Sequence, residues 1–271
     1  MLKDITLGQY FPADSIVHRM DPRTKIIVTV LYVAVVFMAK NAFALALPVL
    51  FLFTAAALSQ IPPRLLLKSV KGIIPIIVLT GLLNMFYVRG ETVYWSWWVF
   101  SFSKEGIFNA LFIVSRILIM IAGSSMLTYT TTPTTLTDGI ERLMMPLKLF
   151  RINVHDLAMV MTIALRMVPT LIEETDRIIS AQKARGADME SGGPIKRLRA
   201  MLPVFLPLLI SAFLRARDLA IAMECRCYTG VNRTRMKVLR MARRDYLAFG
   251  VFLLLLAGVL LLNIPFKAVL L

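Results

Sequence analysis

Two arginines in the second half of the chain each stand between small residues. The two motifs are Ala184-Arg185-Gly186 and Cys225-Arg226-Cys227. Arginine stays charged under all conditions, and its planar donors match carboxylates and backbone carbonyls. Small neighbours would let such a side chain enter a cleft on another molecule. A single arginine of this kind could simply be a helix-end charge facing water. The repeat favours docking, with two similar contacts for two similar partners.

Each motif follows a long helical pattern. Apolar residues recur at helical spacing from Leu157 to Ile172, in a helix expected to reach Arg185, and again from Leu198 to Met223 before Arg226. A shorter amphipathic helix is expected before them, with Thr135 and Asp138 as a capping box and an end near Phe150. Gly186 and Gly230 could supply the left-handed residues at the two long helix ends. A pair of membrane spans is the alternative for the two long helices.

Composition places these helices in a membrane protein. The chain has 271 residues, 58% hydrophobic and 17% charged, with a mean hydropathy of +0.73 and a net charge of +15. A soluble domain is less apolar and more charged, and a nucleic-acid binder of this basicity would be polar. Two cysteines exclude a disulfide framework, and with only two histidines a structural zinc site is not expected. The Cys-x-Cys pair fits small-residue packing better than metal or redox chemistry.

Five apolar runs are long enough to be membrane spans. They are residues 24–40, 42–59, 72–88, 106–130 and 246–263. Asp21 and Pro22 are expected to cap the first span, and Lys25 and Lys40 to reach out to water from its ends. Arg116 lies inside the fourth span, where a charge is costly, so we expect it to face the bundle interior or a partner.

The basic residues predict the orientation. With the N-terminus in the cytoplasm, 26 of the 31 Lys and Arg lie on that side, and the C-terminus lies outside. A belt of aromatic residues is then expected at the outer interface, namely Tyr94, Trp95, Trp97, Trp98, Phe100 and Phe102. The predicted fold class is an all-α multi-pass membrane protein. Residues 1–130 hold four spans, residues 131–244 form a cytoplasmic helical domain, and residues 245–271 hold the fifth span and a tail.

These motifs together resemble the transmembrane T component of energy-coupling factor (ECF) transporters, a family that includes the permease subunit of cobalt importers. The first 25 residues are similar to the N-terminal pattern of this family, through Gly8-Gln9-Tyr10, Ser15, His18 and Asp21-Pro22-Arg23-Thr24-Lys25. Thr131-Thr132-Pro133 resembles the element after the fourth span, and the two X-Arg-X motifs are the most specific similarity. The stretch Glu190-Ser191-Gly192-Gly193-Pro194 looks like the shared type that serves several vitamins. The second motif departs slightly from the family, with Cys225 where alanine is common.

The resemblance implies a scaffold in a prokaryotic plasma membrane that has no transported substrate of its own. It implies that Ala184, Arg185, Gly186, Cys225, Arg226 and Cys227 dock two ABC ATPase subunits. The sequence has no Gly-x-x-x-x-Gly-Lys-Ser/Thr motif, so partners must hydrolyse ATP, and we expect neither enzymatic activity nor a bound cofactor here. A membrane-embedded, substrate-binding S component, or several interchangeable ones, would be the third partner.

Ten of the 16 methionines fall in residues 131–244, and their flexible side chains suit a surface that accepts different partners. The candidate S-component contacts are Met144, Met159, Met161, Leu165, Met201, Phe205 and Leu209. Two alternatives stay open: a self-sufficient permease, and a permease subunit dedicated to cobalt or biotin. The first would need a polar path, for which Asn84, Asn109, Arg116, Ser124 and Ser125 are a small supply. No nucleic-acid partner is expected.

Overall fold

A computed structural model describes residues 10–87, 93–97, 100–150, 153–187, 193–230 and 239–263. The chain divides into two compact units by its internal contacts. One unit is Gly8–Leu143 with Leu239–Leu271, and it holds the predicted spans. The other is Met144–Val238 with Met1–Leu7, and it holds both X-Arg-X motifs.

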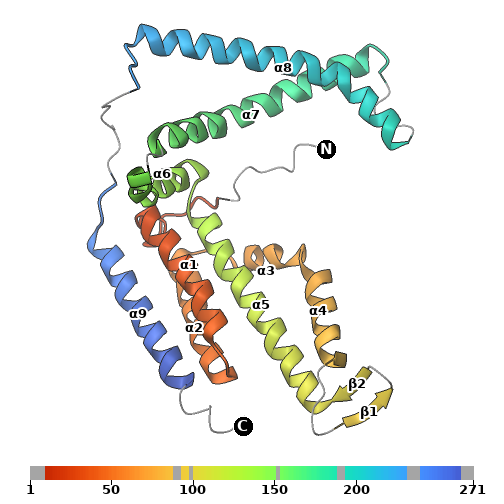
Figure 1. Cartoon of the computed structure of the whole chain (residues 1–271), viewed down its shortest axis with the longest axis vertical. Helices are drawn as coiled ribbons and strands as arrows, with labels where there is room; N and C mark the ends of the chain where they lie inside the picture. Colours follow the sequence, from red (N-terminus) through yellow and green to blue (C-terminus); the bar gives the residue numbers. More distant parts are fainter. Residues whose placement is uncertain are drawn as a thin grey trace. The chain divides into compact units, whose positions relative to one another are not determined.

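The first unit is a bundle of long apolar helices (Figure 1). Helices α1 (Pro22–Met38), α2 (Ala42–Ser59) and α9 (Arg243–Asn263) pack against one another, and α5 (Lys104–Thr130) packs against α1 and α2. These four helices coincide closely with four of the predicted runs. As predicted, Asp21 is the N-cap of α1, its side chain accepting from the Arg23 amide, and Pro22 is the first helical residue.

The region of the third predicted span is broken. Helix α3 (Pro63–Lys71) and helix α4 (Ile74–Tyr87) meet at an angle of 69°. The predicted run 72–88 therefore corresponds to α4 alone, which starts two residues later. Helix α3 is amphipathic and ends in Lys68 and Lys71, as suits a helix along a polar interface rather than through the apolar core.

A small β-hairpin follows α4. Strand β1 (Val93–Trp97) pairs antiparallel with β2 (Phe100–Ser103), with Trp97 opposite Phe100. Ser103 then caps α5 by accepting from the Gly106 amide. The fold is helical, as predicted, and the hairpin is an addition that sequence analysis did not anticipate. Of the expected aromatic belt, Trp98 lies outside the described residues, and the position of the others relative to a membrane stays a prediction.

The core of this unit forms where α1, α2, α5 and α9 meet. Tyr32 lies directly against Gly123, where any side chain would collide with its ring. Its hydroxyl donates to the Pro48 carbonyl at 3.2 Å, and its ring stacks on Phe51. A small residue on one helix thus lets two helices approach closely, as is common in membrane bundles. Phe252 of α9 is buried in the same cluster.

Helix α6 (Pro133–Leu143) completes this unit by packing against α1. It begins at Pro133, two residues before Thr135, where the capping box was predicted. Thr132 makes the capping contacts instead: its hydroxyl accepts from the Thr135 amide, and its carbonyl accepts from the Leu136 amide. Division by contacts therefore places α6 with the spans, and the second unit starts at Met144.

The second unit contains the short 3₁₀-helix η1 (Met145–Phe150) and the long helices α7 (Val154–Ala184) and α8 (Pro194–Cys225). Contacts show that α7 and α8 run antiparallel (Figure 1): Glu174 pairs with Arg215, and Gln182 lies against Pro203. Near the other end, the Tyr228 hydroxyl donates to Met159 Sδ at 3.1 Å. The two long helices predicted between the fourth and fifth spans are present as α7 and α8, whereas the shorter helix expected to end near Phe150 is divided into α6, which ends at Leu143, and η1.

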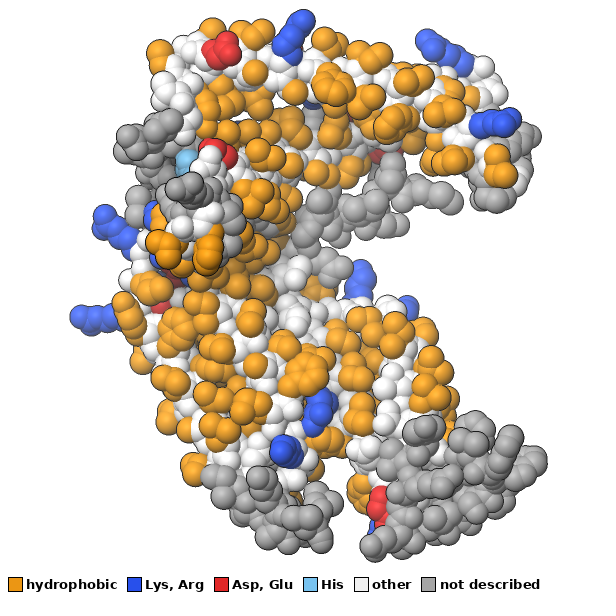
Figure 2. All heavy atoms as spheres, viewed as in Figure 1, with side chains coloured by type: hydrophobic (Ala, Val, Ile, Leu, Met, Phe, Trp, Pro, Cys, Tyr) orange, Lys and Arg blue, Asp and Glu red, His pale blue; other side chains and the backbone are white. Residues whose placement is uncertain are grey.

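Five helices among the described residues are long and apolar enough to cross a membrane, namely α2, α5, α7, α8 and α9, and the bent α3–α4 pair would make a sixth. Helix α1 has 17 residues. Length and composition alone therefore do not separate the predicted spans from α7 and α8. Figure 2 shows hydrophobic side chains over much of the visible surface of each unit, as expected of a chain that meets lipid or apolar partners.

Candidate functional site

The C-terminal end of α7 presents the first arginine motif in a Schellman turn. Arg185 is the C-cap residue, and Gly186 follows in the left-handed conformation with φ of 84°. The Gly186 amide donates to the Lys183 carbonyl at 3.0 Å, and the Ala187 amide to the Gln182 carbonyl at 3.0 Å. These two bonds satisfy carbonyls that a helix end leaves without partners. The backbone is thus closed on itself, and the Arg185 side chain is exposed.

The end of α8 has the same geometry. Arg226 is the C-cap residue, and Cys227 takes the left-handed position with φ of 57°. The Cys227 amide donates to the Glu224 carbonyl at 2.9 Å, and the Tyr228 amide to the Met223 carbonyl at 3.0 Å. Gly230 has a positive φ of 75° just beyond the terminus, as expected, but the turn that closes the helix is made by Cys227.

Both motifs point outward and lie far apart. All six motif residues are exposed, so both guanidinium groups can reach a partner. Because α7 and α8 are antiparallel, the Arg226 end lies beside Met159 and the first turns of α7, whereas Arg185 ends that helix. At 1.5 Å per residue, about 39 Å of helix separates Met159 from Arg185. This spacing suits two separate partner subunits better than one small ligand.

The pair of helices is held together by polar and apolar contacts. Arg215 Nη2 lies 2.9 Å from Glu174 Oε2, and both side chains are partly buried. Beside this ion pair, side chains such as Met167 and Ala216 line a cavity of about 220 Å³ between α7 and α8.

Four of the seven residues predicted to contact an S component are exposed. Met201, Phe205 and Leu209 follow one another at four-residue spacing on α8, and Met161 lies on α7. Met144, Met159 and Leu165 are half-buried, and Met159 already accepts the Tyr228 hydroxyl. Further exposed apolar residues on α8 were not among the predicted contacts, although their helical spacing could have identified them. They are Leu198, Leu202, Leu206, Ile210 and Phe213.

A buried polar cluster at the start of α1 involves much of the predicted N-terminal pattern. Lys25 is 7% exposed, so the expectation that it reaches out to water is wrong. Its Nζ donates to the Thr130 carbonyl at 2.8 Å, the His18 carbonyl at 3.1 Å and Thr131 Oγ1 at 3.3 Å. Thr131 belongs to the motif after α5. Lys25 thus ties the start of α1 to the point where the chain leaves α5.

The same turn of α1 also holds the chain where it returns to α9. Asp245 is 1% exposed, and its carboxylate accepts from the Asp21 amide at 2.9 Å and the Ala242 amide at 2.7 Å. Arg23 Nη2 donates to the Leu239 carbonyl at 3.1 Å. The start of α1 therefore binds the chain at two places in the sequence. One is the end of α5, before the residues of the second unit, and the other is the segment that leads into α9, after them. Sequence analysis did not identify Asp245.

His18 fixes the segment before α1. One ring nitrogen lies 2.7 Å from Ser15 Oγ and the other 3.0 Å from the Phe11 carbonyl. The Phe11 amide in turn donates to the Tyr129 carbonyl. Burial lowers the pKa of His18 below its ordinary value of 6.5, against the opposing effect of the Phe11 carbonyl. The neutral ring is therefore favoured in the folded chain.

Arg116 faces the bundle interior, one of the two positions predicted for it. Its guanidinium donates to the Ala39 carbonyl, at the C-terminal end of α1, and lies 4.6 Å from the centre of the Phe112 ring. Among the described residues, its charge is thus met by the negative end of a helix dipole and an aromatic face rather than by a carboxylate. Asn263 of α9 donates to the Met38 carbonyl at the same end of α1.

Metal chemistry finds no support in the described part of the chain. No group of three or more His, Cys, Asp or Glu residues is placed there to hold an ion. Cys225 and Cys227 are free and exposed.

Comparison with known proteins gives a consistent result over most of the chain. Residues 13–238 match the family model CbiQ, described as cobalt transport protein. The energy-coupling factor transporter transmembrane protein EcfT of Ruminiclostridium cellulolyticum is 47% identical over 98% of this chain and 100% of its own length. Its counterparts in Thermosediminibacter oceani (45% identical over 92% of this chain and 94% of its own) and Acidaminococcus fermentans (46% over 94% and 95%) are similar to the same extent.

Proposed function

The chain belongs to the family of ECF transporter transmembrane proteins, and from that premise we propose that it couples two ABC ATPase subunits to a membrane-embedded S component that binds a micronutrient. It is a multi-pass membrane component of a transporter and not an enzyme. In this proposal ATP is hydrolysed by the partners, and substrate specificity belongs to the S component.

The matched geometry of Arg185 and Arg226 carries the proposal. Each is the C-cap of a Schellman turn, each is exposed, and the two lie at opposite ends of an antiparallel helix pair. The two arginine turns are alike and are separated by about 39 Å along α7. Such a pair suits two ATPase subunits that are identical or related in fold. Closing and opening of the ATPases would then change the angle between α7 and α8.

The exposed apolar face of α8 supports an S component as the third partner. Met201, Phe205 and Leu209, together with Met161 of α7, present flexible and aromatic side chains to a hydrophobic partner. Such a surface can accept several interchangeable S components, the shared type that the sequence resembles. A permease subunit dedicated to cobalt or biotin would need one fixed partner instead.

Charge supports a cytoplasmic position for α7 and α8 despite their length. Both helices carry charged residues along their course, including Glu174, Arg177, Arg215 and Asp218. Charges within a span are costly, and the cytoplasmic side of membrane proteins is enriched in Lys and Arg. The N-terminus is then cytoplasmic and the C-terminus outside.

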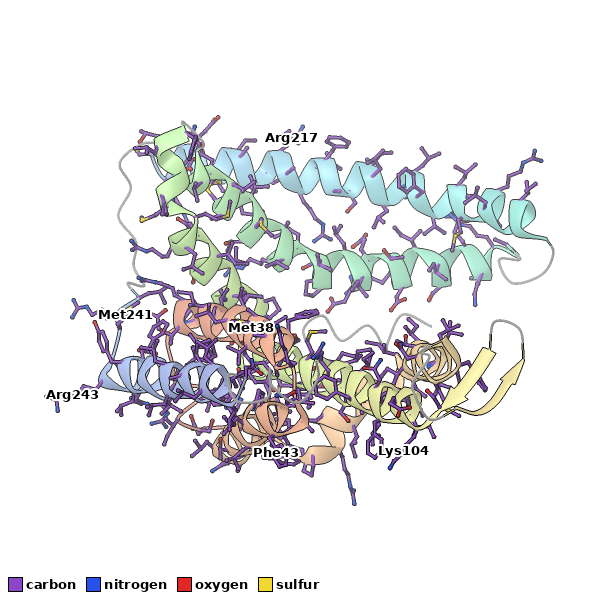
Figure 3. All side chains as sticks on the ribbon, turned by 60° about the horizontal axis from the view of Figure 1, so that its bottom comes forward. Met38, Phe43, Lys104, Arg217, Met241 and Arg243 are labelled. Atoms are coloured by element: carbon purple, nitrogen blue, oxygen red, sulfur yellow. The ribbon has the colours of Figure 1, made fainter. Side chains whose placement is uncertain are left out.

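The test is ATPase binding and transport by arginine variants of the full complex. Arg185→Ala and Arg226→Ala should each weaken co-purification of an ATPase subunit, because a charge-assisted hydrogen bond contributes roughly 1.5–3 kcal/mol. The double variant should lose ATP-dependent uptake into proteoliposomes. Arg217→Ala is the matched control, because Arg217 is an exposed arginine on α8 (Figure 3), 71% exposed, outside the motifs.

Normal uptake by the double variant would overturn the docking role. Uptake by this chain in proteoliposomes without any partner would instead support the self-sufficient permease. Co-purification of two ATPases and one small hydrophobic protein in mild detergent, lost only in the motif variants, is the expected result. A series of different small proteins on the wild-type chain would identify the shared type.

A further inference from the structure

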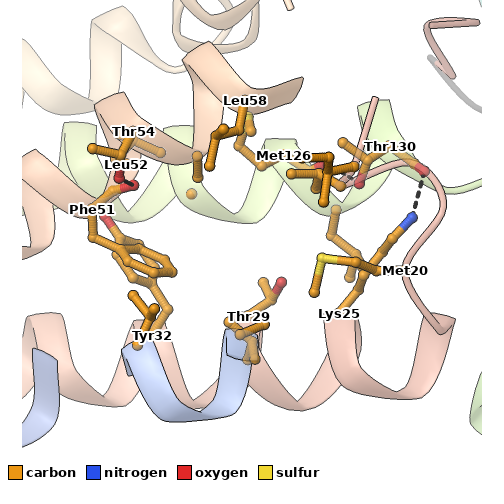
Figure 4. A pocket seen from close by; sticks show the side chains of 18 of the residues that line it. Met20, Lys25, Thr29, Tyr32, Phe51, Leu52, Thr54, Leu58, Met126 and Thr130 are labelled. Carbon is orange, nitrogen blue, oxygen red and sulfur yellow. Dashed lines mark hydrogen bonds between the residues drawn. The ribbon is translucent and has the colours of Figure 1, made fainter. Parts of the chain in front are cut away.

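An apolar cavity, partly open to its surroundings, lies between α1, α2, α5 and α9 of the first unit. Its volume is about 400 Å³. Figure 4 shows Tyr32 and Phe51 at one end of the cavity and Lys25, Met20 and Thr130 at the other. Arg244, in the first turn of α9, also lines it. The cavity therefore runs from the first turns of α1 and α9 into the bundle.

The walls select an apolar occupant. They consist mainly of aliphatic and aromatic side chains, and the volume lies within the range of about 300–1,000 Å³ usual for ligand sites. Apolar cavities stay dry and take up apolar molecules. In a membrane helix bundle, the apolar molecule present at the highest concentration is a lipid acyl chain, and each buried methylene adds to its affinity.

The charge at one end selects the headgroup. Two cations, Lys25 and Arg244, line this end of the cavity, and the carboxylates of Asp21 and Asp245 stand at the same starts of α1 and α9. Both carboxylates are engaged by backbone amides. Lys25 uses its three donors on oxygens of the protein, so it contributes charge but no free donor. Arg244 is exposed and lines the cavity, which leaves its guanidinium to contact a ligand.

We propose that this cavity is a binding site for one anionic glycerophospholipid, with an acyl chain between Thr29, Tyr32, Ala55 and Gly123 and the phosphate on Arg244. Basic pockets between membrane helices bind anionic headgroups in this way. The site does not depend on the docking of ATPases. With the orientation proposed above, the charged end of the cavity lies in the cytoplasmic leaflet, and this assignment alone rests on the proposed function. The bound chain would fill the space between α1, α2, α5 and α9, next to the buried cluster that joins the start of α1 to the end of α5 and to α9.

The experiment measures lipid retention by the full chain. The chain is reconstituted in nanodiscs of phosphatidylcholine with or without phosphatidylglycerol, released into detergent, and its retained lipid identified by native mass spectrometry. The wild-type chain should retain one phosphatidylglycerol, and its thermal unfolding midpoint should rise with phosphatidylglycerol content. Arg244→Gln should weaken the preference for phosphatidylglycerol about fivefold, the effect expected for one cation at an anionic headgroup. Ala55→Leu, which fills the cavity, should reduce retention of any lipid.

Two control variants separate this site from general membrane electrostatics. Arg243→Gln removes the neighbouring cation, which points away from the bundle in Figure 3 and does not line the cavity. Ala57→Leu places the same side chain on an exposed face of the same helix, α2. Equal effects of Arg243→Gln and Arg244→Gln, or equal retention of phosphatidylcholine and phosphatidylglycerol by the wild-type chain, would overturn the proposal. If Ala55→Leu fails to fold, the comparison of the two arginine variants still decides.

Discussion

Cys227 occupies at the end of α8 the same left-handed position that Gly186 occupies at the end of α7. A side chain in that conformation costs roughly 1 kcal/mol, which glycine avoids. Cys227→Gly should therefore stabilise its helix end by up to ~1 kcal/mol, and Gly186→Ala should destabilise the other by about as much. Hydrogen exchange at the two helix ends measures this. Gly72→Ala is the control, because Gly72 has φ of −67° and space around it, so the variant should be neutral or stabilising. A less stable Cys227→Gly variant would contradict the assignment.

Removing the Lys25 ammonium should loosen the junction at the start of α1. Lys25→Met keeps most of the length of the side chain but leaves the Thr130 and His18 carbonyls without their donor. Buried groups left without partners cost about 1–3 kcal/mol each. The thermal unfolding midpoint in detergent should fall accordingly. Lys40→Met is the matched control on an exposed lysine just beyond the other end of α1, and an equal midpoint for both variants would rule out the structural role of Lys25.

Arg116 should be needed for stable packing of α5 against the end of α1. Arg116→Leu removes the donor to the Ala39 carbonyl and the contact with Phe112, at an expected cost of about 1–3 kcal/mol. Thermal unfolding and the yield of assembled complex are the measurements. Lys104→Leu changes an exposed cation at the start of the same helix and should have little effect. Unchanged stability and yield in Arg116→Leu would show that its inward position is not important for assembly.

The Glu174–Arg215 pair should contribute modestly to the contact between α7 and α8. Because both side chains remain partly exposed, a double-mutant cycle with Glu174→Gln and Arg215→Met should give a coupling energy of up to about 1 kcal/mol that decreases with salt. The Arg217–Asp218 pair is the control, since its atoms lie 3.9 Å apart with both side chains about 70% exposed. Its coupling should be close to zero. A larger value there than at Glu174–Arg215 would contradict the importance of burial.

Acid should loosen the segment before α1 through His18. The pKa of His18 is lowered in the folded chain mainly by burial, so the unfolded chain binds more protons below the ordinary value of 6.5. The stability that the neutral ring contributes is fully present above pH 6.5 and is lost as pH falls through the folded pKa. Hydrogen exchange of the Phe11 amide as a function of pH measures this. His18→Gln should abolish the pH dependence, and its persistence would assign the effect to another group.

Sequence predicted the features that depend on local pattern. Four helices of the first unit followed from long apolar runs, the cap of α1 from Asp21 and Pro22, and the ends of α7 and α8 from the small residues around two arginines. The partners of Lys25 could not be predicted, because Thr130 and Thr131 are more than a hundred residues away and meet it only through packing. The left-handed Cys227 was missed because a nearby glycine offered the easier conformation. The contacts of the motif arginines with ATPases stay a prediction.

The shortness of α4 has a consequence for the surrounding lipid. Its 14 residues rise about 21 Å, whereas the hydrocarbon core of a bilayer is about 30 Å thick. Such hydrophobic mismatch is relieved when the bilayer thins beside the helix, at a fraction of a kcal/mol for each ångström. If α4 crosses the membrane, the leaflets would be drawn together along one side of the bundle. A neighbouring membrane protein would then tilt there at lower cost than in undisturbed bilayer.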